Sequence, residues 1–220
     1  MIKIENITKV YRGIVLIYAL KEVDLIIEKG DFTAVAGPSG SGKTTLLNLI
    51  GGLDRPTSGK IHVDGVEVTN LSLGQLSRLR LEKISYVFQS HNLIPVLTAM
   101  ESVEFIMQLQ GIPFIERQQK AREILREVGL AGLEGKRPHE MSGGQRQRVA
   151  VARAVVAEPE IILADEPTAN LDSNAAAGLV DLMRALNEKK GTTFLLSTHD
   201  PLVMKKAKKV VEIRDGIIVS

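Results

Sequence analysis

A glycine-rich loop joins a predicted strand to a predicted helix and has the spacing of a phosphate-binding site, G-x-x-x-x-G-K-[ST]. Its glycines keep side chains away, so successive backbone N–H groups can point into one concavity and bind a di- or triphosphate. Lys43 would reach the β- and γ-phosphates, and the Thr44 hydroxyl would ligate Mg²⁺. A glycine-rich turn could match by chance, but the order strand, loop, helix favours a phosphate site. The loop comprises Gly37, Pro38, Ser39, Gly40, Ser41, Gly42, Lys43, Thr44 and Thr45.

Two adjacent acidic residues follow an apolar run at 161–164. Asp165, the last residue of the predicted strand, would hold Mg²⁺ directly or through water. Glu166 would point toward the γ-phosphate and orient or polarise the attacking water. An exposed acidic turn would have the same sequence, and it is the phosphate loop in the same predicted sheet that favours the catalytic interpretation.

A second helix start has the features of an anion site. It begins with Ser142, Gly143, Gly144 and Gln145, so a hydroxyl and bare N–H groups face whatever lies beyond the N-terminus. By themselves these residues form an ordinary helix cap. The phosphate loop already encloses the phosphates that it binds, so the second motif suggests a site that another molecule completes.

Two further side chains lie near predicted strand ends. His199 follows the strand at 193–197, where it could hydrogen-bond to a γ-phosphate, although a lone histidine is more often a surface residue. Tyr11 ends the first strand and could stack on an adenine face, although an isolated aromatic side chain more often serves packing. Their positions make both of them candidate nucleotide contacts.

Strands and helices alternate along most of the chain, which predicts an α/β fold with a parallel sheet and crossover helices. Ligands of such sheets bind beyond the carboxyl ends of the strands. Gly37, Gln89, Asp165 and Ser197 lie at these ends, so we expect four polar positions to converge on one edge of the sheet. The strands concerned are predicted at 32–36, 84–88, 161–165 and 193–197.

The N-terminal third departs from this alternation. Apolar and polar residues alternate at 2–11, and a second strand is predicted at 18–27. Asp64 and Gly65 form a predicted hairpin turn between 60–63 and 66–68. We therefore expect an antiparallel β subdomain beside the parallel sheet.

The middle of the chain has a helical period from about residue 98 to 133, which predicts an inserted α-helical lobe. We expect a single domain over 1–220, with the core and the β subdomain at 1–95 and 146–220 and the helical subdomain at 96–145. Helices are predicted at 76–81, 101–109, 117–128, 142–157, 173–187 and 201–208, and closing strands at 210–213 and 217–219.

The composition narrows the classes of function. A net charge of +2, an aromatic content of 4% and the absence of Trp argue against a nucleic acid as the main partner. The absence of Cys excludes disulfides and thiolate metal sites. With no signal-peptide pattern and no long apolar run, we expect a soluble, cytoplasmic chain that serves a membrane only through a partner. The lysine-rich run at 205–209 is predicted to be a solvated helix end rather than a contact for anionic lipid or nucleic acid.

In their order, these motifs resemble those of the ATP-binding cassette (ABC) ATPases. The resemblance covers the whole chain and implies a RecA-like P-loop fold. Two departures are small, because Met141 replaces a usual leucine and Ala169 stands where glycine or serine is commoner. The matching motifs are residues 37–45 (Walker A), Gln89 (Q-loop), 141–145 (signature), 161–166 (Walker B), Asn170 to Asp172 (D-loop) and His199 (switch histidine).

Three segments, 18–20, 51–54 and 92–101, look like the lipoprotein-releasing, macrolide-exporter and cell-division subgroup. The resemblance implies an active ATPase that uses ATP and Mg²⁺, with Glu166, His199 and Gln89 as its catalytic residues. It also implies that Thr44, Gln89 and Asp165 form the Mg²⁺ site.

The same resemblance implies two partners. Subunits would pair head to tail, with each ATP between one Walker A motif and the signature of the second copy. Asp172 would couple the two sites, and Tyr11 would stack on adenine. The helical lobe and the segment after Gln89 would dock a cytoplasmic helix of a transmembrane permease, at the inner face of the membrane.

Several functions are compatible with these motifs. The first is an ATP-hydrolysing subunit that drives export or extraction of a substrate through a membrane partner. The second is a cassette of the cell-division type, which transmits force or regulates cell-wall enzymes without transport. A soluble cassette acting on DNA or ribosomes would usually carry a coiled-coil insert, tandem cassettes or cysteine-bound zinc, and a small-molecule kinase would not need residues 142–145. The motifs do not identify a substrate or a direction of transport.

Overall fold

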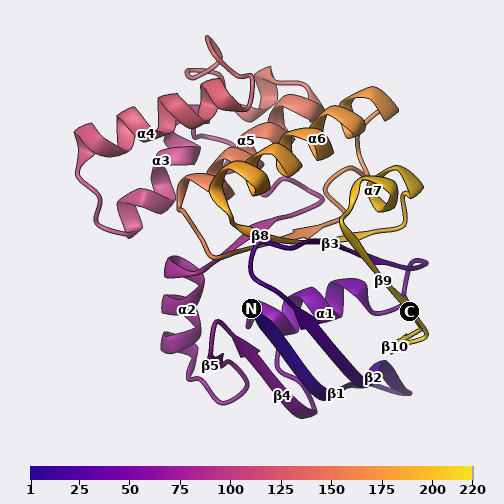
Figure 1. The fold of residues 1–220 in the computed structure, drawn as a ribbon. Helices are drawn as coiled ribbons and strands as arrows, with labels where there is room; N and C mark the ends of the chain where they lie inside the picture. Colours follow the sequence, from indigo (N-terminus) through magenta and orange to yellow (C-terminus); the bar gives the residue numbers. More distant parts are fainter. Residues whose placement is uncertain (220) are drawn as a thin grey trace.

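Two β-sheets form the centre of the molecule, for which a computed structural model describes residues 1–219 (Figure 1). The larger, six-stranded sheet has the order β10-β9-β3-β8-β7-β6, and the smaller, four-stranded sheet has the order β2-β1-β4-β5. The strands are β1 (Ile2–Arg12), β2 (Leu16–Ile27), β3 (Phe32–Ala36), β4 (Ser58–Val63), β5 (Val66–Glu67), β6 (Ile84–Val87), β7 (Ile161–Asp165), β8 (Thr193–Thr198), β9 (Lys209–Arg214) and β10 (Ile217–Ile218).

The larger sheet is parallel except at one edge. Strand β3 pairs in parallel with β8 and β9, and β7 pairs in parallel with β8 and β6, whereas β10 runs antiparallel to β9. The carboxyl ends of β3, β8, β7 and β6 therefore lie at the same edge. This order confirms the predicted convergence of polar residues, since Asp165 is directly opposite Ser197 in the register.

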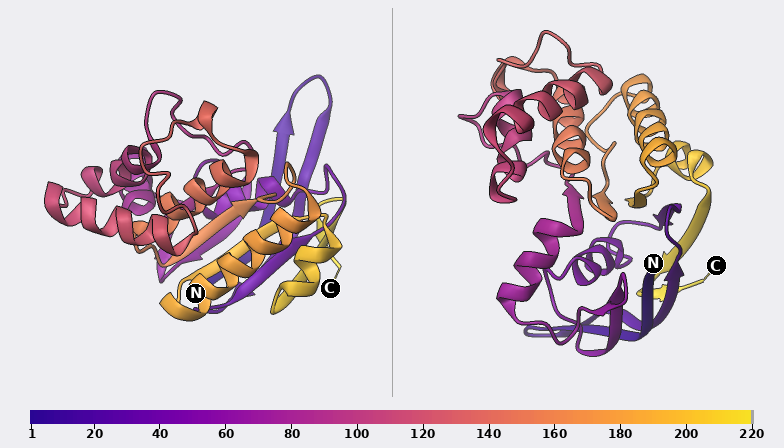
Figure 2. Two further views of the ribbon diagram at one scale, coloured as in Figure 1. Left: turned by 90° about the horizontal axis from the view of Figure 1, so that it is seen from above. Right: turned by 60° about the vertical axis from the view of Figure 1, so that its left-hand side comes forward.

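The smaller sheet is antiparallel, as the N-terminal pattern predicts. Strand β1 pairs with β2 on one side and with β4 on the other. The β1–β2 hairpin extends beyond the body of the sheet, as the left view of Figure 2 shows. Its far end carries Tyr11 opposite Ile17, so these two side chains lie on the same face of the hairpin.

Helices cover both faces of the larger sheet. Helices α3 to α6 lie on one side, and α1 lies between the two sheets (Figure 1). The strands alternate accordingly, because Ile162 and Phe194 pack with the helices of the first side, whereas Leu163 and Leu195 pack with α1. The helices are α1 (Lys43–Ile50), α2 (Leu73–Glu82), α3 (Ala99–Leu109), α4 (Phe114–Glu127), the 3₁₀ helix η1 (Pro138–Glu140), α5 (Gly143–Val156), α6 (Ser173–Lys190) and α7 (Pro201–Lys206).

Most element ends shift by a few residues from their predicted positions, and local capping explains one of the shifts. Helix α3 begins at Ala99 rather than at Glu101, because the Thr98 hydroxyl and the Glu101 side chain form a reciprocal capping box. No helix within residues 1–219 has both the length and the apolar composition that a bilayer crossing requires.

The lysine-rich run at 205–209 corrects one prediction. Helix α7 ends at Lys206, so the run crosses a helix end and enters β9. Lys206 pairs with Asp181, and Lys209 pairs with Asp31 at 2.7 Å. Lys208 donates to the side chain of Asn187 at 3.0 Å. The helix is therefore shorter than predicted, because Lys208 and Lys209 lie beyond its end, although both stay exposed to solvent. The paired lysines join α7 and β9 to neighbouring elements.

Candidate nucleotide-binding site

The glycine-rich loop follows β3 and leads into α1, and two of its glycines are required by close backbone contacts. A Cβ atom on Gly37 would lie 2.2 Å from the Ile213 carbonyl oxygen. A Cβ atom on Gly42 would lie 2.4 Å from the Ala19 carbonyl oxygen, and the φ of Gly42 is +109°. Gly42 is also the N-cap of α1, and no side chain caps this helix. The first N–H groups of α1 therefore have no capping side chain as a competitor for an anion.

Lys43 is a buried cation, and two backbone carbonyls accept hydrogen bonds from its ammonium group. Its Nζ donates to the Gly37 carbonyl at 2.8 Å and to the Pro38 carbonyl at 2.9 Å. The same Nζ lies 3.6 Å from Oε1 of Glu166. Since an ammonium group has three N–H donors, the loop carbonyls orient Lys43 and leave one donor for an anion. Only 4% of this side chain is exposed, so its position is fixed by the surrounding loop.

Asp165 ends β7 and holds two hydroxyl groups. Its Oδ1 accepts from Thr44 Oγ1 at 2.9 Å and from Ser197 Oγ at 2.5 Å. The structure thus brings the first turn of α1 and the ends of β7 and β8 together at one carboxylate. Sequence reasoning put Ser197 at this edge but missed its contact with Asp165, which depends on the strand register.

Glu166 has an uncommon backbone conformation for a residue other than glycine, with φ of +43°. Its N–H lies within hydrogen-bond distance of the Ser197 hydroxyl (2.9 Å) and of the Ser197 carbonyl (3.2 Å). Its Oε2 lies 3.2 Å from Nδ1 of His199. The carboxylate is therefore held between Lys43 on one side and His199 on the other, at the edge where the phosphate loop lies.

An open pocket of about 420 Å³ joins these groups to the β1–β2 hairpin. The Tyr11 hydroxyl donates to Asp54 at 2.9 Å, which fixes the ring at the mouth of the pocket. Ile17 and Ala19 also line it; Ala19 lies in the segment 18–20 that resembles the subgroup, whereas no motif includes Ile17. The lining residues are Tyr11, Ile17, Ala19, Ser39, Gly40, Gly42, Lys43, Thr44, Thr45, Gln89 and Glu166.

The second helix start does not line this pocket. Ser142 and Gln145 form a capping box, in which the Ser142 hydroxyl accepts from the Gln145 N–H and the Gln145 side chain accepts from the Ser142 N–H. Gly143 lies near Asn170, and Gly144 lies near Ala175 at the start of α6. Within one chain these residues thus have the contacts of a helix cap.

Asp172, which also does not line this pocket, is the N-cap of α6. Its carboxylate accepts from the N–H groups of Asn174 at 3.0 Å and Ala175 at 2.9 Å. The structure therefore gives this residue a capping contact, and it gives no contact with the phosphate loop. A smaller pocket, of about 320 Å³, lies beside Glu166 and His199 and includes Thr168, Ala169, Leu171 and Asp200.

The oxygen groups at Asp165 fit a magnesium ion that also binds phosphate. Among residues 1–219, no cluster of three or more His, Cys, Asp or Glu side chains could hold a metal by itself. Mg²⁺ is usually bound through one or two protein oxygens together with substrate phosphates and water. Thr44 and Asp165 supply such oxygens beside the phosphate loop, and Gln89 lines the same pocket.

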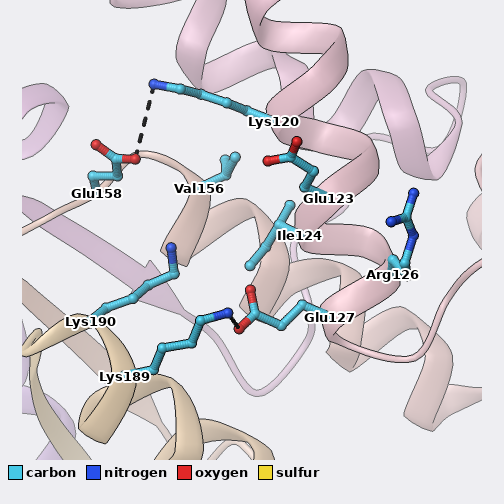
Figure 3. Close-up of a pocket in the computed structure, with 9 residues that line it drawn as sticks. All are labelled: Lys120, Glu123, Ile124, Arg126, Glu127, Val156, Glu158, Lys189 and Lys190. Carbon is cyan, nitrogen blue, oxygen red and sulfur yellow. Dashed lines mark hydrogen bonds and ion pairs between the residues drawn. The ribbon is translucent and has the colours of Figure 1, made fainter.

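A larger pocket, of about 470 Å³, lies elsewhere, between α4, the end of α5 and the end of α6 (Figure 3). Ion pairs cross it, from Lys189 to Glu127 at 2.6 Å and from Lys120 to Glu158 at 4.0 Å. Its floor includes Ile124 and Val156. None of the motif residues lines this pocket, which we call the α4–α6 groove.

Comparisons with known proteins agree on one family. The family model described as ABC transporter matches residues 20–169. An uncharacterized ABC transporter ATP-binding protein of Methanocaldococcus jannaschii, MJ0796, is 45% identical over 98% of this chain and 94% of its own length. The macrolide export ATP-binding/permease protein MacB of Campylobacter jejuni is 48% identical over 91% of this chain, which corresponds to 31% of MacB.

Solved structures give the same result. The dimeric structure of the post-hydrolysis state of the cassette MJ0796, bound to ADP and Pi, has a TM-score of 0.93 at 42% identity and covers 100% of this chain and 97% of that one. The structure of cbiO1 from Clostridium perfringens, part of the transporter complex cbiONQ, has a TM-score of 0.90 at 29% identity and covers 100% of this chain and 86% of that one.

Proposed function

This chain belongs to the ABC transporter family as an ATP-binding and ATP-hydrolysing component, and we propose that it drives export or extraction of a substrate through a transmembrane partner. The observation that carries the proposal is the pocket in which Lys43, Thr44, Gln89 and Glu166 meet. The name of the MacB relative includes both ATP-binding and permease functions, and this chain matches 31% of the length of that protein. A transmembrane permease would therefore be the partner of this ATPase.

ATP would bind with its phosphates over the N-terminus of α1. The uncapped N–H groups of the first turn and the remaining donor of Lys43 support this position. The adenine would stack on Tyr11, with Ile17 beside it on the same face of the hairpin. Each group is already held by protein contacts, so little reorganisation would accompany binding.

Mg²⁺ would be held by Thr44, Gln89 and Asp165, together with the phosphates, and it would supply positive charge to the leaving group. The Thr44–Asp165 and Ser197–Asp165 hydrogen bonds support this assignment, because they orient the carboxylate before the ion arrives. Removal of Mg²⁺ would therefore weaken both nucleotide affinity and turnover.

Hydrolysis would depend on Glu166 and His199. Glu166 would orient the attacking water and accept its proton, since its carboxylate faces Lys43 at 3.6 Å and His199 at 3.2 Å. His199, at the end of β8, would hold this carboxylate and hydrogen-bond to the γ-phosphate. Gln89 would transmit the effect of nucleotide binding to the segment that follows it.

A second copy of the chain would complete the site. Residues 142–145 begin α5 outside the pocket, and the MJ0796 relative is dimeric in its ADP- and Pi-bound structure. The signature of one copy would cover the ATP held by the other, and Asp172 would couple the two sites. Closing and reopening of this dimer would transmit work to the permease.

The division of the chain follows from these roles. Residues 1–95 and 146–220 would form the nucleotide-binding core and β subdomain, and residues 96–145 would form the helical subdomain. The helical subdomain and the segment after Gln89 would contact the permease. The chain would therefore lie at the cytoplasmic face of the membrane, bound peripherally through that partner.

The substitution Glu166→Gln tests the proposal. It keeps the side-chain size but removes the anion, so turnover should fall about 100-fold or more while ATP binding is retained. An ATPase assay and size-exclusion chromatography with MgATP are the measurements, and the variant should accumulate as a dimer. Glu160→Gln, at an exposed ion pair with Lys29, is the matched control. The proposed role of Glu166 is wrong if turnover survives and no dimer accumulates.

A further inference from the structure

The segment that follows Gln89 is held in position by a half-buried arginine. Arg153, on α5, donates from its two terminal nitrogens to the carbonyl of Asn92 at 2.6 Å and to the carbonyl of His91 at 3.1 Å. Both acceptor residues have left-handed backbones, with φ of +64° at His91 and +45° at Asn92. Residues other than glycine adopt this conformation only where other contacts offset its cost.

Within residues 1–219 Arg153 forms no ion pair with a carboxylate, and its guanidinium is hydrogen-bonded to these two carbonyls. Burial lowers the pKa of the Arg153 guanidinium from its ordinary value. A buried cation without a counter-ion is costly unless polar groups satisfy it, and the planar guanidinium can bind two adjacent carbonyls at once. The arginine and the left-handed turn therefore stabilise each other.

Other side chains complete the attachment of this segment. Gln147, also on α5 and almost fully buried, donates to the Phe88 carbonyl at 3.4 Å. Asn170 donates to the carbonyl of Gln89 itself at 3.2 Å. Four carbonyls within residues 88–92 thus accept bonds from side chains distant in sequence.

The same segment also lies near the first half of α5. Burial and, secondly, the nearby charge of Arg146 lower the pKa of His91. Arg146 and Gln147 lie in the first half of α5, and Arg153 lies in its last turn. Side chains from two parts of α5 therefore hold the turn after Gln89.

We propose that Arg153 is a positioning residue for ATP hydrolysis, which fixes the turn at residues 90–92 and thereby holds the Gln89 side chain in the nucleotide pocket. The inference rests on the proposed function of that pocket. Because α5 begins with the signature residues, a displacement of this helix would move Gln89 through the same contacts. Arg153 acts through Gln89 and does not itself line the pocket.

A double-mutant cycle on turnover tests this inference. Arg153→Lys keeps the charge but cannot bind two carbonyls in the same planar geometry. We expect kcat to fall about 10- to 100-fold, with KM for MgATP changed less than about threefold, as for a displaced catalytic group. In the Gln89→Ala background the same substitution should reduce kcat less than about twofold, because its effect passes through Gln89.

Arg148→Lys is the matched control. Arg148 is also on α5 and also donates to a backbone carbonyl, that of Val128 at 2.7 Å, but it does not contact residues 88–92. Arg148→Lys should lower the free energy of unfolding. It should not cause a loss of kcat that disappears in the Gln89→Ala background. Equal losses of kcat for Arg153→Lys with and without Gln89 would overturn the proposal, as would a loss of the same size in Arg148→Lys.

Hydrogen–deuterium exchange of the full-length chain provides a readout that does not depend on ATPase activity. Amides within residues 88–97 should exchange about tenfold faster in Arg153→Lys, with no change in the buried part of α5. Unchanged exchange in this segment would overturn the proposal even if turnover fell. If exchange became faster but the protein neither bound nor hydrolysed ATP, the contact of Arg153 with this segment would be supported. The function proposed for the pocket would then be wrong.

Discussion

The nucleotide pocket and the α4–α6 groove have similar volumes, about 420 and 470 Å³, but they differ in how their charged groups are held. In the pocket, Lys43 is 4% exposed and is bound by two carbonyls of its own loop. In the groove, Lys189 is 65% exposed and pairs only with Glu127. The pocket therefore presents charges in fixed positions, whereas the groove presents side chains that water can separate.

The two regions also lie at opposite ends of helices. The pocket is at the N-terminus of α1, where N–H groups attract an anion. The groove includes Val156, the last residue of α5, and Lys190, the last residue of α6. Helix C-termini favour cations, so the lysines of the groove offset the carbonyl ends of the helices. The volumes of the two regions therefore do not identify the nucleotide site. The direction of the nearby helices identifies it, because only the pocket lies at a helix N-terminus.

The largest expected difference between the two regions is in their lysines. Lys43→Ala removes a buried donor aimed at the phosphates, so kcat/KM for MgATP should fall about 100- to 1,000-fold. Lys190→Ala, in the groove, should leave kcat/KM within about twofold of the original value. Steady-state ATPase assays of both variants measure the difference. Similar losses in the two variants would remove the distinction between the regions.

The next largest effect concerns Gly42, in the nucleotide pocket, and Gly191, which follows Lys190 of the groove along the chain. Gly42→Ala combines a φ of +109° with a Cβ only 2.4 Å from the Ala19 carbonyl, so the free energy of unfolding should fall by about 2–4 kcal/mol. Gly191 ends α6 with a φ of +70°, but a Cβ there meets no atom within 4 Å. Gly191→Ala should therefore cost only about 1 kcal/mol of conformational strain. Urea unfolding of both variants would show whether close packing around the loop makes the difference.

A smaller effect is expected from the Ser197 hydroxyl, which connects the Asp165 carboxylate to the backbone N–H of Glu166. Ser197→Ala removes a donor to Asp165 and an acceptor near the Glu166 N–H, so kcat should fall about tenfold and stability by about 1–2 kcal/mol. Ser197→Thr retains the hydroxyl and should recover most of the activity. A Ser197→Ala enzyme with normal kcat would mean that Asp165 and Glu166 keep their orientation without it.

Ser197 also illustrates which features the sequence could predict. The succession of strands and helices along the chain, the glycine-rich loop and the polar ends of β3, β6 and β7 follow from local patterns, and the structure agrees with them. The bonds of Ser197 to Asp165 depend on register between two strands that lie far apart in the sequence. Spacing along one segment contains no information about such a lateral contact.

The sequence patterns predicted neither the contacts of Arg153 nor the end of α7, for related reasons. An arginine within a helical pattern predicts an exposed charge, and only tertiary packing brings Arg153 against the carbonyls of His91 and Asn92. Helical periodicity continues past Lys206, but Lys209 is already paired in register with Thr33 of β3. In both cases a contact with a distant element determines the outcome, and local propensity does not.

The smallest expected effect is in the α4–α6 groove itself. Lys189 and Glu127 are 2.6 Å apart but partly exposed, so a double-mutant cycle with Lys189→Met and Glu127→Gln should give a coupling energy below about 1 kcal/mol. Chemical unfolding at low and high salt is the measurement, and the coupling should decrease with salt. Turnover should be unaffected, because neither residue lines the nucleotide pocket. A salt-independent coupling well above this value, or a change in turnover, would mean that the groove holds its charges as firmly as the pocket does, and the contrast between the two regions would then fail.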